Sequence, residues 1–137
     1  MIKRKSGHIV AISSITGLFG FRLRSAYSAA KHAMIGFYES LWCELTDQGI
    51  NVTIVCPGRV HTNISLHAIT KNGEAYGLMD HGQDSGTSAQ VCAKQILKAV
   101  KSKKVLVYVG GKELLMVYFK RYIPWLFYRL VTKVQPT

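Results

Sequence analysis

The sequence predicts an α/β fold, in which parallel strands alternate with helices. Two short runs rich in β-branched residues, 8–12 and 50–56, flank a long segment whose apolar residues recur every three or four positions. A second helical segment and a third apolar run follow along the chain. A strand, a helix and a strand in this order form a βαβ unit, so we expect parallel strands and a right-handed crossover.

The first strand is predicted over residues 8–12, between Gly7 and the pair Ser13-Ser14. A short apolar run of this kind is typical of a strand that is buried on both faces. The segment that follows, residues 16–25, contains two glycines and is predicted to form a loop.

A long helix is predicted over residues 26–48, with Ser25 as the residue that caps its start. Gly49 suits the left-handed position that ends a helix. The apolar residues expected on the core face are Ala30, Ala33, Met34, Phe37, Leu41 and Leu45. Further apolar residues, Ile35, Tyr38 and Trp42, lie off that face, and this excess predicts a homo-oligomer with the helix at the contact.

The second strand is predicted over residues 50–56, where Pro57-Gly58 stops it. Residues 63–86 carry four glycines without clear periodicity. A long irregular segment in a compact domain is usually functional or mobile, so this segment is a candidate lid.

A second helix is predicted to start at a cap formed by Thr87 or Ser88 and to run to about Lys101. A third strand follows over residues 105–109 and ends at Gly110-Gly111. The apolar side of this helix is expected to carry Val91, Ile96, Leu97 and Val100.

The last segment, residues 112–134, is aromatic, basic and amphipathic, and Pro124 is expected to split it into two helices. We assign residues 1–111 to one domain and 112–137 to a helical extension. Packing in a core or interface is the favoured role of the extension, ahead of peripheral contact with an anionic membrane surface.

Composition restricts the classes of function. The 137 residues are 48% hydrophobic and 18% charged, as in globular proteins. The net charge of +11 attracts phosphates without specifying them, and no groove-reading or base-stacking module is recognisable, so nucleic acid is not an expected partner. Three cysteines without a C-x-x-C pair, and five histidines without ligand spacing, predict neither a disulfide framework nor a metal site. We expect a protein that is not secreted and lies in the cytoplasm or on the cytosolic face of a membrane.

Tyr27 and Lys31 are four residues apart at the start of the long helix, so their side chains share one face. A phenol with its ordinary pKa of about 10 is a poor base near neutrality, but a neighbouring ammonium favours the phenolate form. Ser14 and Pro57-Gly58 end two strands at the edge where parallel α/β sheets bind ligands. An exposed surface pair, a capping serine and an ordinary turn are the alternative interpretations of these features.

In combination, three sequence blocks resemble the short-chain dehydrogenase/reductase family, which has a Rossmann-type fold. The resemblance covers roughly residues 7–110, and the extension is loosely similar to that of the membrane-associated dehydrogenase/reductase member 7 group. The blocks, which match in order and spacing, are Ile12-Ser13-Ser14, Tyr27-Ser28-Ala29-Ala30-Lys31 and Pro57-Gly58-Arg59-Val60-His61-Thr62.

The resemblance implies an oxidoreductase that interconverts a secondary alcohol and a ketone or aldehyde with NAD or NADP, NADP being slightly favoured. Ser14 would bind and polarise the substrate oxygen, and Tyr27 would act as general acid/base. Lys31 would hold the nicotinamide ribose and favour the phenolate form of Tyr27. The residues expected to border the nicotinamide and pyrophosphate are Pro57, Gly58, Val60 and Thr62.

The family's glycine-rich phosphate turn and its Asn-Asn-Ala-Gly strand do not occur in these 137 residues. We therefore expect the C-terminal half of a doubly wound parallel sheet, without the N-terminal dinucleotide-binding half, and no activity from this polypeptide alone. The alternative is a truncated, non-catalytic binding or scaffold protein that keeps the fold.

Overall fold

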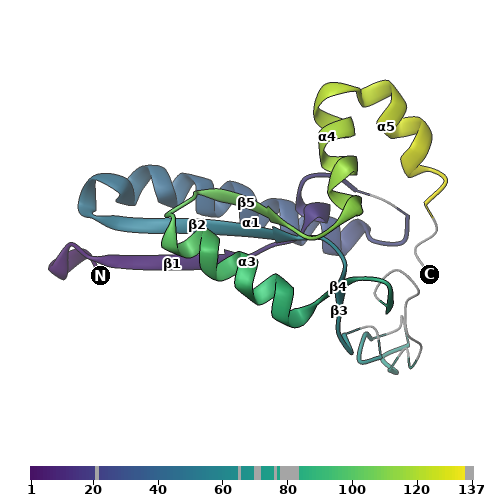
Figure 1. The fold of residues 1–137 in the computed structure, drawn as a ribbon, viewed down its shortest axis with the longest axis horizontal. Coiled ribbons are helices and arrows are strands. Elements are labelled where there is room, and N and C mark those ends of the chain that lie inside the picture. The colour runs from purple at the N-terminus through teal and green to yellow at the C-terminus, as the bar shows by residue number, and fades with distance from the viewer. Residues whose placement is uncertain (21, 65, 70–71, 76, 78–83, 135–137) are drawn as a thin grey trace.

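The computed structural model confirms an α/β fold built on a parallel sheet (Figure 1). It describes residues 1–20, 22–64, 66–69, 72–75, 77 and 84–134. The sheet has three strands in the order β1-β2-β5, which are β1 (Gly7–Ile12), β2 (Ile50–Pro57) and β5 (Leu106–Val109). Two short parallel strands, β3 (Val60–His61) and β4 (Thr87–Ser88), pair separately. Single turns of 3₁₀ helix are η1 (Ile2–Arg4), η2 (Ile15–Gly17), η3 (Thr46–Gln48) and η4 (Lys112–Leu114).

The register of the sheet brings the ends of its strands to one edge. In the parallel pairing, Ile12 of β1 lies beside Val55 of β2, and Pro57 of β2 lies beside Val109 of β5. The residues that follow each strand therefore meet at the carboxyl edge of the sheet. In an open α/β sheet this is the edge at which ligands bind.

The central strand β2 is buried on both faces because helices cover both. Val52, Ile54 and Cys56 belong to the core cluster that includes Ile35 of α1 (Ser25–Leu45). Val55 lies between Ile54 and Cys56 in the strand, but it belongs to a second cluster with Cys92 of α3 (Ala89–Lys101). Since successive strand residues point to opposite faces, α1 and α3 lie on opposite sides of the sheet.

The prediction that the first strand is buried on both faces is wrong. In β1, Ala11 is buried, but Val10 and Ile12 are 39% and 45% exposed. These two side chains lie on the sheet face that α3 covers, and on that face α3 packs against β2 and β5. Among the described strands β1 pairs with β2 alone, so it forms an edge of this sheet.

Helix α1 confirms the predicted position of the long helix but corrects its cap and its core face. Arg24, without a side-chain cap, precedes the helix, and Ser25 is its first residue. The predicted stripe is only partly right, because Leu45 is buried but Phe37 is 62% exposed. The side chains that face the core are Ile35 and Leu45, which are buried, and Tyr38 and Trp42, which pack against it.

Two apolar stripes on α1 have helical spacing, so periodicity alone could not decide which of them meets the sheet.

After the helix, η3 forms a final tight turn, and Gly49 has a φ of 70°. This value confirms the left-handed end predicted for the helix.

Helix α3 begins as predicted, with Ser88 as its capping residue. Its predicted apolar side is only partly right, because Val91 and Leu97 are 45% and 59% exposed. Cys92 and Ala99 are buried instead. The prediction overlooked them because it considered only the larger apolar side chains of this helix. The candidate lid, residues 63–86, falls partly outside the described residues and stays a prediction.

The C-terminal extension forms two helices, as the position of Pro124 predicts. Helix α4 (Leu115–Tyr122) and helix α5 (Pro124–Val131) make a hairpin at one end of the molecule (Figure 1). Their buried side chains Val117, Phe127 and Val131 join Ile15 and Phe19 in the main core cluster. One face of the extension therefore packs in the core. Within the described ranges, none of the helices is both long and apolar enough to cross a bilayer.

Candidate active site

Ser14 lies at the carboxyl edge of the sheet and links two strand ends. It is 8% exposed, and its hydroxyl caps η2 by accepting a hydrogen bond from Thr16 N at 3.2 Å. The same hydroxyl lies 3.4 Å from Pro57 O, to which it donates a long hydrogen bond. Ser14 is thus a capping residue in this structure.

The turn that carries Ser14 is pressed against α1 by two neighbouring residues. Ser13 Oγ donates to Lys31 O at 2.9 Å. A Cβ on Gly17 would lie 2.7 Å from Lys31 O and 2.9 Å from Ile35 Cδ1, so only glycine permits this approach. These contacts fix Ser14 relative to the turn of α1 that bears Lys31.

Tyr27 and Lys31 lie together at the start of α1. Lys31 Nζ is 5.7 Å from the centroid of the Tyr27 ring, which is within range of a cation–π contact. Lys31 Nζ also donates to Ile12 O at 3.1 Å, which ties it to the end of β1. Tyr27 is 45% exposed, and its hydroxyl has no hydrogen-bond partner in the described part of the chain.

The structure therefore joins Ser14 and Tyr27 through Lys31. No contact between described residues links the two hydroxyls directly. Lys31 contacts the backbone two residues before Ser14 on one side and the Tyr27 ring on the other.

The other predicted cofactor-binding residues follow β2 along the same edge. Gly58 N donates to Val109 O at 2.7 Å, which extends the β2–β5 pairing by one residue. Val60 lies in β3 and pairs with Thr87 of β4. Among the described residues, no contact brings Val60 or Thr62 to Tyr27 or Lys31. These residues form the second half of the candidate site.

The side chains present fit the nicotinamide end of a dinucleotide. An ammonium carries three donors, so Lys31 can bind hydroxyls in addition to Ile12 O. Tyr27 is 45% exposed and lies beside Lys31 on α1. Within the ranges described, His, Cys, Asp and Glu side chains form no group of three that could hold a metal ion.

Sequence reasoning missed two residues that support this site. It treated Ser13 only as a residue that ends a strand. In the structure the Ser13 hydroxyl contacts the backbone of α1 at Lys31. It also missed Lys120, whose Nζ donates to Leu18 O just beyond the Ser14 turn. That contact spans more than one hundred residues of sequence and has no local signal.

The buried thiol of Cys56, next to Ser13 and Ser14, makes the stability of the protein depend on pH. Burial raises the pKa of its thiol from 9.0 to about 11, although a hydrogen bond from the Ser14 backbone and another from the Ser13 side chain act in the opposite direction. The folded state thus holds this proton more tightly than the unfolded state, and the stabilisation is complete below pH 9. We expect the free energy of unfolding to fall by roughly 2–3 kcal/mol between pH 9 and 11.

Urea unfolding at several pH values would measure this fall, and the Cys56→Ala variant is the control. In the variant, the free energy of unfolding should not show this fall between pH 9 and 11, since no thiol is present at this position. Equal slopes in the two proteins would contradict the assigned cause.

Comparisons with known proteins show the family and the fold of the chain. The family model for short chain dehydrogenase matches residues 1–72. The chain is 44% identical over 132 residues to Dehydrogenase/reductase SDR family member 7B of Bos taurus, covering 96% of the chain and 41% of that relative. It is 39% identical over 134 residues to Dehydrogenase/reductase SDR family protein 7-like of Drosophila melanogaster, covering 97% of the chain and 41% of that relative. The chain thus spans about two fifths of the length of these relatives.

Solved structures show the same fold. A short chain dehydrogenase from Burkholderia cenocepacia in complex with NADP superposes with a TM-score of 0.73 at 21% identity, covering 96% of the chain and 50% of that structure. A short chain dehydrogenase/reductase from Burkholderia phymatum in complex with NAD gives 0.71 at 21% identity, covering 100% of the chain and 53% of that structure. The arrangement of three parallel strands and flanking helices is therefore a partial Rossmann-type sheet.

Proposed function

The chain belongs to the short-chain dehydrogenase family, and on that premise we propose that it carries the catalytic residues of an NAD(P)-dependent oxidoreductase that interconverts a secondary alcohol and a ketone or aldehyde. The observation that supports this proposal most directly is the position of Lys31. Its ammonium lies against the Tyr27 ring and is tied to the end of the strand that leads to Ser14.

Each of the three side chains has a distinct role in the proposed reaction. A bound nicotinamide would donate the hydride in reduction and accept it in oxidation. In reduction Tyr27 Oη gives its proton to the carbonyl oxygen, and in oxidation it takes the proton from the alcohol. Ser14 Oγ donates a hydrogen bond to the same oxygen and so orients it. Lys31 lies beside the Tyr27 ring and holds the ribose hydroxyls.

The cofactor is a nicotinamide dinucleotide, and we retain NADP as the slightly favoured form. Pro57, Gly58, Val60 and Thr62 would border its nicotinamide and pyrophosphate. The two structures with similar folds were solved with NADP and with NAD respectively, so they favour neither form. The expected substrate is a small-molecule alcohol or carbonyl compound.

The test uses a complemented chain, in which residues 1–137 replace the matched segment of bovine member 7B. We expect this protein to bind NADPH at micromolar concentration and to reduce members of a panel of aliphatic and aromatic ketones and aldehydes. Residues 1–137 alone should do neither. Cofactor binding without turnover on any carbonyl compound would favour the non-catalytic scaffold alternative.

We also propose that the complete enzyme is a homo-oligomer with α1 at the contact. The apolar excess that motivated this prediction has a different location from the one expected, because Ile35, Tyr38 and Trp42 pack in the core. The outer face instead carries Phe37, which is 62% exposed. Burying such a side chain against a second copy is favourable by roughly 1.5–3 kcal/mol.

Replacing Phe37 by glutamate in the complemented chain should therefore lower its mass in light scattering at micromolar concentration to that of a monomer. Leu97→Glu makes the same change at a similarly exposed position on α3, and it should leave the mass unaltered. A monomeric mass before any substitution would count against the oligomer.

Peripheral membrane contact through residues 112–134 is a further proposal, supported by the outer face of the α4–α5 hairpin. Exposed aromatic side chains there include Tyr122 at 70% and Trp125 at 68%. Arg121 and Arg129 are exposed on the same two helices. Aromatic rings and cationic groups are the combination that binds the interface of an anionic bilayer.

We expect the complemented chain to sediment with vesicles of phosphatidylcholine and phosphatidylserine and to bind pure phosphatidylcholine much more weakly. Trp125→Ala should reduce the bound fraction several-fold, because it removes an interfacial aromatic ring. Leu97→Ala removes a 59% exposed apolar side chain from α3 and is the control. Equal binding by the two variants would contradict a role for the hairpin.

A further inference from the structure

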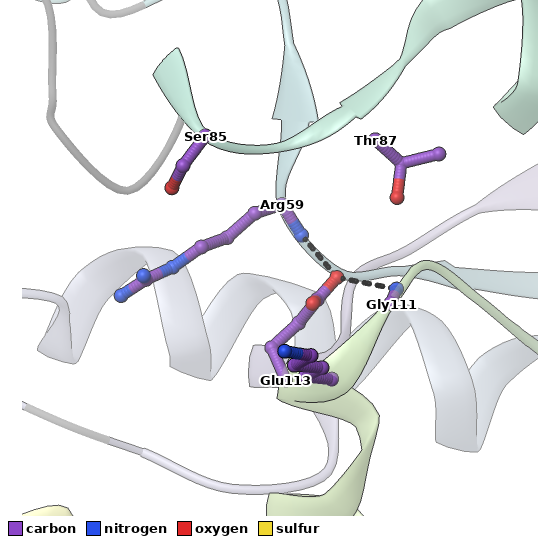
Figure 2. Close-up of a pocket in the computed structure, with 6 residues that line it drawn as sticks. Arg59, Ser85, Thr87, Gly111 and Glu113 are labelled. Atoms are coloured by element: carbon purple, nitrogen blue, oxygen red, sulfur yellow. Dashed lines mark hydrogen bonds between the residues drawn. The ribbon is translucent and has the colours of Figure 1, made fainter.

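Glu113 lies between two loops at the carboxyl edge of the sheet. It belongs to η4, the turn that follows β5. Its Oε1 accepts one hydrogen bond from Arg59 N and another from Gly111 N, each at 3.0 Å (Figure 2). A single carboxylate oxygen thus joins the loop after β2 to the loop after β5.

The surrounding backbone leaves room for this carboxylate by omitting side chains. A Cβ on Gly58 would lie 2.1 Å from Glu113 Oε1. A Cβ on Gly110 would lie 2.4 Å from the same oxygen, and the φ of 153° at Gly110 also disfavours any other residue. Gly58 belongs to the Pro57-Gly58 motif, so the glycine of that motif makes space for Glu113 in this structure.

The loop that Glu113 holds is the one that leads to the proposed cofactor-binding residues. Gly58 N is held by Val109 O, and Arg59 O accepts a hydrogen bond from Thr87 N at 2.9 Å. The hydrogen bond from Arg59 N to Glu113 is a further tether. A side chain also supplies the long hydrogen bond from Ser14 Oγ to Pro57 O at the start of the loop. Val60 follows Arg59 directly. Without Glu113, two backbone donors would lose their acceptor, and the loop would lose its tether at Arg59.

We propose that Glu113 is a positioning residue that holds the loop of residues 57–60 in the conformation that binds the nicotinamide side of the cofactor. This inference rests on the proposed function for its consequence in catalysis, whereas the tether itself is independent of any activity. Glu113 contacts neither Tyr27 nor Lys31 among the described residues. Its loss should therefore affect cofactor binding more than the chemical step.

The acceptor geometry, rather than the negative charge, is the property that the loop requires. A glutamine at position 113 keeps an oxygen that can accept from both Arg59 N and Gly111 N, although hydrogen bonds to a neutral amide are weaker than those to a carboxylate. An alanine keeps neither. The conservative variant should thus restore most of what alanine removes.

The experiment compares Glu113→Ala and Glu113→Gln in the complemented chain, with Asp47→Ala as a control at an exposed acidic residue of η3. We expect Glu113→Ala to raise the KM for NADPH about tenfold while kcat stays within about threefold. Amide hydrogen exchange at Arg59 and Gly111 should become at least about tenfold faster. Glu113→Gln and Asp47→Ala should stay within about threefold of the unsubstituted protein in both measurements.

Hydrogen exchange separates failure of this proposal from failure of the proposed function. If the unsubstituted complemented chain shows no turnover, calorimetric affinity for NADPH replaces KM as the binding measurement. Faster exchange with weaker NADPH binding in Glu113→Ala, restored in Glu113→Gln, supports the positioning role. Unchanged exchange, unchanged binding, or a glutamine variant that behaves like alanine would overturn it.

Discussion

Replacing Tyr27 by phenylalanine in the complemented chain is expected to lower kcat by about 10²–10⁴-fold, the range that a positioned general acid/base contributes. The substitution removes one hydroxyl and keeps the ring that lies near Lys31. Because Tyr27 Oη has no hydrogen-bond partner in the described residues, its removal leaves no buried group unsatisfied there. Stability and affinity for NADPH should therefore change little.

Steady-state kinetics and calorimetry with NADPH measure the two quantities separately. Tyr122→Phe removes a hydroxyl from a tyrosine of α4 that is 70% exposed, and it should leave kcat unaltered. If Tyr27→Phe kept more than about a tenth of kcat, the proton would have to reach the substrate from another group, and the assigned role of Tyr27 would be wrong.

The second large effect is expected at Phe127, where alanine should destabilise the complemented chain by about 3–5 kcal/mol. The Phe127 side chain is 1% exposed and meets the Phe19 ring edge-on, with the centroids 5.3 Å apart. Removing the ring would leave a cavity between α5 and the segment that follows Ser14. Tyr128→Ala is the matched control, since it removes a 61% exposed ring from the next position of the same helix.

Urea unfolding would measure this loss, and the expected cost of Tyr128→Ala is smaller because much of that ring remains in water. A cost below about 1 kcal/mol for Phe127→Ala would mean that the α4–α5 hairpin is not part of the cooperative core. In that case the extension would unfold separately from residues 1–111, contrary to the core or interface packing that the sequence predicts for it.

The candidate site was largely predictable because its signals are local. Tyr27 and Lys31 share a helix face at a spacing of four residues, and Ser14 ends a strand whose apolar run is evident in the sequence. The Pro57-Gly58 pair ends the next strand in the same way. Parallel pairing then places both strand ends at one edge of the sheet. The structure gives each of these residues its place, and their roles in catalysis stay predictions.

The supporting contacts were not predictable because they join residues far apart in the chain. Glu113 reaches the backbone of Arg59, and Lys120 reaches the backbone of Leu18. Ser13 depends on the close approach of η2 to α1, which Gly17 permits. None of these contacts leaves a periodic or spacing signal, since each depends on where the folded elements meet.

By itself, the sequence determined the order of strands and helices, the parallel sheet, the break at Pro124 and the identity of the three candidate catalytic residues. These features follow from residue type and from periods of two or 3.6 residues, which act over a few positions of the chain. The tertiary structure alone decided which stripe of α1 meets the sheet, which side chains of α3 are buried, and that Val117, Phe127 and Val131 belong to the main core. The physical reason is that α1 carries two apolar stripes of similar spacing, and burial is fixed only when a helix packs against its neighbours. For the same reason, the link from the C-terminal hairpin to the turn beside Ser14 exists only in the folded chain.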